Sequence, residues 1–368
     1  MSKFLYASRL ALPALFFGYA IFANLTLFTE RQPSLVLPDS GLLSGGLTHD
    51  LDGVYKKDLP HMALSFGLIG AARYAVLGEA RQGAVVGQNG WLFSAEEVRP
   101  LPTDAVLAGI AETVQDVARQ LSAGGTDLVV VPLPAKIDIY RDVSASAVFG
   151  ASLEALYADF AIDLAARGIA VVDARTALLN STDPVFFATD THWTPLGAHL
   201  VAAAVATSGT IEPGPMTFDR KEEATKPLTG DLVSFVTTDA LAPRIGLLPE
   251  SVTPVVLTAT NAQSDIFGAA VADIVLVGTS YSANTDWGFA NSLMQTLGRD
   301  VVSVAEQGLG PLKPMQDYLD SAVYRDDPPV VVIWEIPIRY LTDPAIWPVA
   351  APAAPQVAAL PRKENSDG

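Results

Sequence analysis

The sequence predicts an α/β fold with a mainly parallel sheet that is flanked by helices. Short apolar runs of strand length alternate with longer segments of helical period from about residue 104 to residue 334. Glycines separate many of these segments, as at Gly124-Gly125 and Gly168. Strands that alternate with helices pair in parallel, and the helices then cover both faces of the sheet.

The predicted elements follow in chain order. A hairpin is expected at Gly83–Phe93, because two apolar runs flank Asn89-Gly90, a dipeptide that suits a tight turn. Helices are predicted at residues 61–81, 104–122, 153–167, 195–207, 287–298 and 313–323, and strands at 127–133, 169–172, 274–277, 300–304 and 330–334. Residues 211–250 show no sustained period and are predicted to be an irregular surface excursion.

Composition excludes several classes of function. The net charge of −17 and the pI near 4.5 leave no basic surface for a nucleic acid. The absence of cysteine excludes a disulfide framework, a thiol nucleophile and thiolate metal ligands.

The amino terminus has the character of a membrane anchor. Residues 10–28 are uncharged and follow Lys3 and Arg9. As a helix this segment would reach roughly 28 Å at about 1.5 Å per residue, close to the hydrocarbon thickness of a bilayer. The preceding positive charges predict a cytoplasmic amino terminus and an exported chain. A cleaved signal peptide is the alternative.

Ser280 stands where a predicted strand changes into helical sequence. The apolar run Ile274–Val277 stops at Gly278, and a helix is predicted from about Trp287. A hydroxyl at the carboxyl end of a strand projects into the crevice where open α/β sheets bind ligands. The amides of the next turn can donate to a developing oxyanion. The alternative is that Ser280 merely caps the following helix.

Asp190 and His192 form a second candidate group. They lie two residues apart in a segment that we expect to be extended, so their side chains can point the same way. Asp190 can then accept from one imidazole nitrogen, which leaves the other to take a proton from a hydroxyl. Two alternatives stay open: His192 could be a packing residue, or Asp190 and His192 could hold a metal ion with His199.

The order of these residues disfavours an α/β-hydrolase. That fold carries Gly-x-Ser-x-Gly and runs serine, acid, histidine along the chain. Here Ser282 replaces the second glycine, and Asp190 and His192 both precede Ser280.

Five segments together resemble a known family, the alginate O-acetyltransferases of the AlgJ/AlgX type, which are SGNH-hydrolase-like enzymes. The segments are Gly87–Phe93, Pro134–Tyr140, Asp190–Trp193, Gly278–Ser282 and Trp334–Tyr340, in the order of the family. The resemblance implies an SGNH-hydrolase-like fold in a circularly permuted order, with the acid and base before the serine.

The resemblance also assigns roles to residues. Ser280 would be the nucleophile, His192 the general base and Asp190 its orienting acid. Gly308 stands where such enzymes supply a second oxyanion amide. The usual Gly-x-Asn-Asp block has no counterpart, because the last strand ends in Trp334-Glu335.

Three further residues are candidates for the acceptor site or for a structural role. They are Tyr281, Arg339 and Tyr340. The resemblance implies an alginate-like polysaccharide as acceptor, an integral-membrane O-acyltransferase as acetyl donor, and no metal or organic cofactor. It also implies a periplasmic enzyme anchored to the inner membrane.

The expected division of the chain follows. Residues 1–9 are the cytoplasmic terminus, 10–28 a transmembrane signal anchor, 29–60 a linker, 61–345 the SGNH-like catalytic domain and 346–368 a disordered tail. Two other functions stay open. An acetylesterase would run the same chemistry with water as acceptor, and a non-catalytic polysaccharide-binding scaffold would keep Ser280 away from His192.

Overall fold

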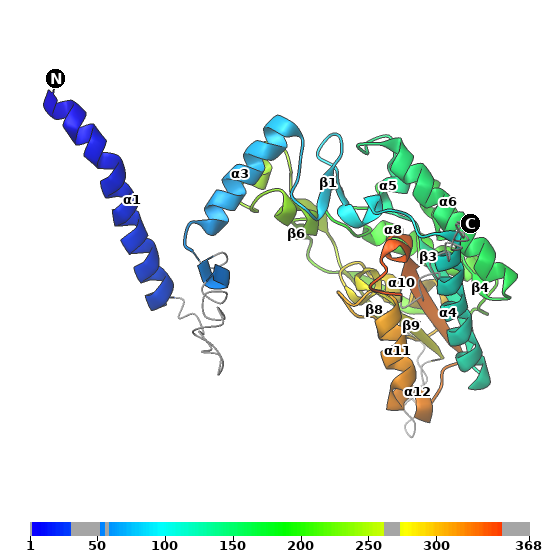
Figure 1. Cartoon of the computed structure of the whole chain (residues 1–368). Helices are drawn as coiled ribbons and strands as arrows, with labels where there is room; N and C mark the ends of the chain where they lie inside the picture. The colour runs from blue at the N-terminus through cyan, green and yellow to red at the C-terminus, as the bar shows by residue number, and fades with distance from the viewer. Residues whose placement is uncertain (1, 31–51, 56–58, 261–272, 348–368) are drawn as a thin grey trace, which may run out of the picture. The chain divides into compact units, whose positions relative to one another are not determined.

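The computed structural model describes residues 2–30, 52–55, 59–260 and 273–347 (Figure 1). The chain divides into two compact units. The smaller comprises residues 1–81 with 234–246, and the larger comprises 82–233 with 247–368. Most of the expected linker and of the expected tail lies outside the described residues.

The larger unit is built on a five-stranded parallel sheet. Its strands are β3 (Asp127–Leu133), β4 (Ala170–Val171), β9 (Ile274–Val277), β10 (Val301–Ser303) and β11 (Val331–Pro337). Their spatial order is β10-β9-β11-β3-β4, and each neighbouring pair is parallel. The predicted α/β fold with a parallel sheet is confirmed.

Side chains of the sheet alternate between two apolar cores. In β3, Val130 packs into one core, whereas Val129 and Val131 pack into the other. The first core contains side chains of α4 (Asp104–Ala123), α6 (Ala147–Ala166), α11 (Leu312–Asp320) and α12 (Ala322–Asp326). The second contains side chains of α7 (Ala174–Leu179), α8 (Pro195–Thr207) and α10 (Phe289–Leu297). Helices therefore cover both faces of the sheet, as expected.

Local sequence explains where several elements begin and end. Helix α8 has Pro195 at its first turn, and the Thr194 hydroxyl accepts from the Gly197 amide at 3.2 Å, so the predicted start is confirmed. Strand β11 continues past Trp334 to Pro337, beyond the predicted end. The prediction stopped early because Glu335 interrupts the apolar run, although its side chain is fully buried.

The Gly83–Phe93 hairpin is present as β1 (Ala84–Val86) and β2 (Leu92–Ser94), which pair antiparallel. Asn89 and Gly90 both have positive φ, as the predicted tight turn requires.

The prediction that residues 211–250 are irregular is wrong in part. Strand β5 (Phe218–Glu222) pairs with β8 (Val255–Ala259), and β6 (Lys226–Leu228) pairs with β7 (Glu250–Val252). These strands lacked a signal because β5 and β6 are largely exposed and carry charged side chains instead of an apolar alternation. The short elements η1 (Ala95–Val98), α5 (Lys136–Ile139), η2 (Asp231–Phe235), α9 (Ser280–Ala283) and η4 (Ile338–Thr342) connect the larger ones.

The smaller unit contains α1 (Ser2–Glu30), α3 (Met62–Leu77) and η3 (Ala242–Ile245). In α3 a Cβ at Gly70 would lie 1.9 Å from the Val236 carbonyl oxygen, so only glycine permits this approach. Helix α1 includes residues 10–28, which confirms that this segment is helical. No helix among the described residues combines the length and apolar character needed to cross a membrane.

Candidate active site

Ser280 lies on a sharp turn at the carboxyl end of β9. Thr279 is the residue that caps α9, with its hydroxyl accepting from the Tyr281 amide at 3.4 Å. The next helix, α10, begins after Gly288, so the alternative in which Ser280 caps the following helix is wrong. Thr279 and Tyr281 are buried, whereas Ser280 is only partly buried, so its hydroxyl is the reachable group of the turn.

A buried carboxylate from the neighbouring strand holds this turn. Glu335 of β11 accepts from the Thr279 amide at 2.8 Å, from the Thr279 hydroxyl at 3.0 Å and from the Ser282 hydroxyl at 2.9 Å. Burial raises the pKa of Glu335, and these hydrogen bonds oppose the rise. Gly278 gives the carboxylate room, because a Cβ there would lie 2.4 Å from Glu335 Oε2.

The segment with Asp190 and His192 is a turn, and the prediction of an extended segment is wrong. The His192 amide donates to Asp190 Oδ1 at 2.8 Å, which makes an Asx-type turn. Phe186 and Trp193 form an isolated antiparallel bridge around it. The turn brings the Asp190 carboxylate against the imidazole of His192, two residues further along the chain. The spacing of the two residues in the sequence did not predict this turn.

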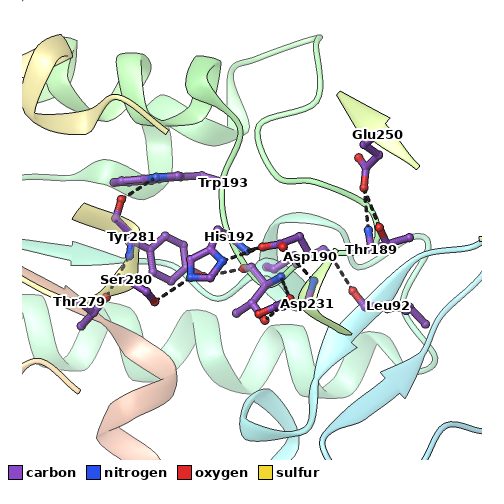
Figure 2. A network of polar contacts seen from close by, with 12 residues as sticks. Leu92, Thr189, Asp190, His192, Trp193, Asp231, Glu250, Thr279, Ser280 and Tyr281 are labelled. Carbon is purple, nitrogen blue, oxygen red and sulfur yellow. Dashed lines mark hydrogen bonds and ion pairs between the residues drawn. The ribbon is translucent and has the colours of Figure 1, made fainter. Parts of the chain in front are cut away.

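The structure brings Ser280, His192 and Asp190 into one hydrogen-bonded line (Figure 2). His192 Nε2 lies 2.7 Å from Ser280 Oγ, and His192 Nδ1 lies 2.6 Å from Asp190 Oδ1. Burial alone would raise the pKa of Asp190, but hydrogen bonds from His192 and from the Asp231 amide hold it below its usual value. An ionised Asp190 keeps Nδ1 protonated, which leaves Nε2 free to accept the serine proton.

Aromatic rings fix the orientation of the imidazole. The Trp287 ring is stacked on His192 with centroids 5.7 Å apart, and Tyr281 meets it edge-on at 4.9 Å. The imidazole keeps 14% of its surface exposed, so a substrate group can reach it.

Acidic side chains hold the backbone of the turn from outside. Glu250 accepts from the Thr189 amide at 3.0 Å (Figure 2). Glu250 also accepts from the Ala188 amide at 2.8 Å, and Asp231 accepts from the Thr191 amide at 2.8 Å. These supports come from η2 and β7, the region in which the sequence showed no pattern.

The three candidate acceptor residues occupy a network behind the turn. The Tyr281 hydroxyl donates to the Thr191 carbonyl at 2.8 Å and accepts from Arg339 Nη1 at 2.9 Å. Arg339 also donates to the Tyr340 hydroxyl and pairs with Glu96 at 2.9 Å. Tyr281 and Arg339 are buried, whereas Tyr340 is partly exposed. Burial raises the pKa of Tyr281, which keeps its hydroxyl protonated.

Gly308 lies on the loop that follows β10. The Glu306 amide donates to the Gly278 carbonyl at 3.1 Å, so this loop runs against the end of β9. Gly308 itself is exposed and has positive φ.

The carboxylates near His192 are engaged in hydrogen bonds. In the described residues, the group close enough to share a cation is Asp190, His192 and Asp231, which does not include the predicted His199. Both carboxylates accept from amides of the turn, and His192 Nε2 faces the serine. Asp190, His192 and Ser280 are therefore arranged as a hydrogen-bonded triad.

Comparisons with known proteins show the family to which the chain belongs. A family model described as "SGNH hydrolase-like domain, acetyltransferase AlgX" matches residues 84–338. The probable alginate O-acetylase AlgJ of Pseudomonas aeruginosa is 35% identical over 319 residues, which cover 82% of each chain. The corresponding protein of Pseudomonas fluorescens is 37% identical, over 82% of this chain and 79% of its own.

A solved structure supports the same assignment. The O-acetyltransferase domain of Pseudomonas putida AlgJ superimposes with a TM-score of 0.63 at 32% identity, over 71% of this chain and 93% of that chain. The structure of Pseudomonas aeruginosa AlgX shares the fold, with a TM-score of 0.56 at 24% identity over 71% of this chain and 67% of that chain.

Proposed function

This chain belongs to the family of SGNH hydrolase-like acetyltransferases that includes AlgJ and AlgX, and we propose that it acetylates an exported polysaccharide through an acyl-enzyme on Ser280. Alginate is the proposed polymer, because the relatives are named as alginate O-acetylases. The observation that carries the proposal is the 2.7 Å separation of His192 Nε2 and Ser280 Oγ.

The first half-reaction acylates the serine. His192 Nε2 takes the Ser280 proton while Oγ attacks the acetyl carbonyl carbon of the donor. The negative charge on the carbonyl oxygen is held by the Ser280 amide and by the Gly308 amide. The donor's leaving group departs with the proton that His192 returns, and the acetyl ester remains on Ser280. Asp190 stabilises the imidazolium between these two proton transfers.

The second half-reaction transfers the acetyl group. A sugar hydroxyl gives its proton to His192 and attacks the acetyl-serine carbonyl. The new ester bond forms, the bond from carbon to Ser280 Oγ breaks, and the proton returns to the serine. Every step uses protons and bonds of the chain and its substrates, so the reaction needs no metal or organic cofactor.

The location of the enzyme is also part of the proposal. The N-terminal helix tethers an exported enzyme to the inner membrane, with the catalytic unit in the periplasm. An integral-membrane O-acyltransferase supplies the acetyl group. The charge pattern of residues 1–28, with Lys3 and Arg9 before the apolar run, supports this orientation.

The Ser280→Ala variant tests the proposal. It should lose acetyl transfer to oligouronate acceptors while its circular dichroism and Tm stay as in the wild type. Transfer that persists at the wild-type rate contradicts the assignment of Ser280.

The ratio of two products separates a transferase from an esterase. Wild-type protein, a small acetyl ester and an oligouronate should yield mainly acetylated oligosaccharide. Free acetate as the main product would favour the acetylesterase. The close contact of Ser280 with His192 already disfavours the non-catalytic scaffold, which has no use for it.

A further inference from the structure

Lys136 is a fully buried lysine beneath the turn that carries Asp190 and His192. Its ammonium donates to three backbone carbonyls: Leu92 at 2.6 Å, Ala188 at 2.9 Å and Asp190 at 2.9 Å. An ammonium has three N–H donors, so these contacts use all of them. Two of the three acceptors, Ala188 and Asp190, precede His192 by four and two residues.

The lysine is fixed at both of its ends. The Lys136 and Ile137 amides each donate to a different oxygen of Glu97 at 3.0 Å, which anchors the backbone. The ammonium lies 5.1 Å from the centre of the Trp91 ring and 5.3 Å from that of Phe93. These aromatic faces favour a cation at this place. Lys136 is therefore a rigid link between the β1–β2 hairpin and the turn.

Packing alone does not account for a lysine here. Taking an ammonium out of water costs several kcal/mol, whereas methionine would fill a similar volume without that cost. Desolvation lowers the pKa of Lys136 to about 8, and carboxylates around it oppose the fall. These carboxylates are Glu97, Glu250, Asp190 and Asp231.

The same carboxylates surround the imidazole turn. Asp190 contacts His192, and Glu250 and Asp231 hold the amides on either side of it. The positive charge of Lys136 offsets part of the combined negative charge of these carboxylates, which are fixed around the same turn.

We propose that Lys136 is a positioning residue that holds the turn carrying Asp190 and His192 in place opposite Ser280. The inference rests on the proposed function, because it assigns Lys136 a task in that reaction. The three hydrogen bonds of the Lys136 ammonium all go to backbone carbonyls, so the lysine acts through the turn.

The test compares Lys136→Met and Lys136→Gln in the full chain. Hydrolysis of a small acetyl ester is measured at pH 7. Lys136→Met should lower kcat by at least about 100-fold with little change in KM, since a misplacement near 1 Å costs about that factor. Lys136→Gln keeps two N–H donors for the backbone carbonyls, so it should recover part of kcat.

Lys226→Met is the matched control. Lys226 is an exposed lysine of the same unit whose ammonium donates to Asp286 at 2.8 Å, so its loss removes the same charge without removing a hydrogen bond to the turn. It should leave kcat and KM unchanged. A folded Lys136→Met with the control's kcat would overturn the inference. A lower Tm alone, with kcat and KM unchanged, would have the same consequence.

A spectroscopic readout needs no substitution and no activity. The downfield NMR resonance of the proton between Asp190 and His192 Nδ1 should shift in wild-type protein as Lys136 loses its proton near pH 8. A resonance that stays fixed from pH 7 to pH 9.5 contradicts the link. If Ser280→Ala keeps full activity while this resonance moves, the proposed function fails and the structural link stands.

Discussion

The Glu335 carboxylate accepts two hydrogen bonds from Thr279, one from its amide at 2.8 Å and one from its hydroxyl at 3.0 Å. This contact joins the last strand of the sheet to the turn that presents Ser280. The turn is thus held by a buried acid of the neighbouring strand, in addition to its own cap. Gly278 is the residue that leaves space for it.

Gly278→Ala should displace the turn that carries Ser280. The added Cβ would meet Glu335 Oε2 at 2.4 Å and Ser282 Oγ at 2.9 Å, so the turn or the carboxylate must move. We expect a loss of about 100-fold in kcat for a small acetyl ester.

A double-variant cycle identifies the cause of that loss. Glu335→Ala alone should lower stability by about 2–4 kcal/mol, because it leaves the buried Thr279 amide without its acceptor and opens a cavity. Combined with Gly278→Ala, it should cost less than the sum of the two changes, as measured by denaturant unfolding. Strict additivity would show that the Cβ and the carboxylate do not collide.

Asp190→Asn should reduce kcat by about three to four orders of magnitude with the fold intact. Asp190 Oδ1 accepts from both the His192 amide and His192 Nδ1, and an asparagine NH2 cannot do this. If the asparagine oxygen instead takes the place of Oδ1, its NH2 group takes the place of Oδ2. That NH2 group would then face the Asp231 amide, and both groups are donors. The pH–rate profile of a small ester is the measurement, and a kcat within tenfold of the wild type would contradict this role.

Tyr281→Phe separates a structural role from an acceptor role. The hydroxyl bonds Thr191 and Arg339 inside the protein, so its loss should cost about 1–2 kcal/mol of stability. The KM for an oligouronate acceptor should stay the same. Tyr340→Phe is the matched control, because that hydroxyl bonds Arg339 at 3.2 Å from a partly exposed position. A raised acceptor KM in Tyr281→Phe at unchanged Tm would instead place the ring at the acceptor site.

The stability of the fold should depend on pH through Lys136. Its pKa is about 8 in the folded protein against 10.5 for an ordinary lysine, because burial disfavours the ammonium. Between these values the unfolded chain binds a proton that the folded chain does not. The free energy of unfolding of the wild type, relative to Lys136→Met, should therefore rise from pH 8 to pH 10.5. Denaturant unfolding at several pH values measures this difference, and a constant difference would show that the lysine titrates normally.

The spacing of apolar residues in the sequence predicted the main strands and helices of the larger unit well. The boundaries of β3, β9 and α8 agree with the predicted ones, because each follows an uninterrupted pattern that ends at a polar residue or a breaker. The apolar pattern failed where a charged residue is buried or where a strand is exposed. The buried Glu335 led to a predicted end of β11 that is too early, and the exposed charged residues of β5 and β6 left these two strands unpredicted.

The candidate residues Ser280, His192 and Asp190 could be named from the sequence because few histidines are present and each candidate stands next to a predicted element boundary. How they meet could not. The expected extended segment is an Asx-type turn, and a backbone turn of this kind depends on contacts from Glu250, Asp231 and Lys136 that lie 40 to 62 residues away.

The sequence by itself determined the parallel sheet and its two layers of helices, and it named the three candidate side chains, because burial period and local breakers are properties of neighbouring residues. Tertiary structure alone decided which buried charges support them. No pattern in the neighbouring sequence marks Lys136 or Glu335 as a buried charge. Their hydrogen bonds form only when folding removes water and places distant carbonyls, amides and hydroxyls around each charge.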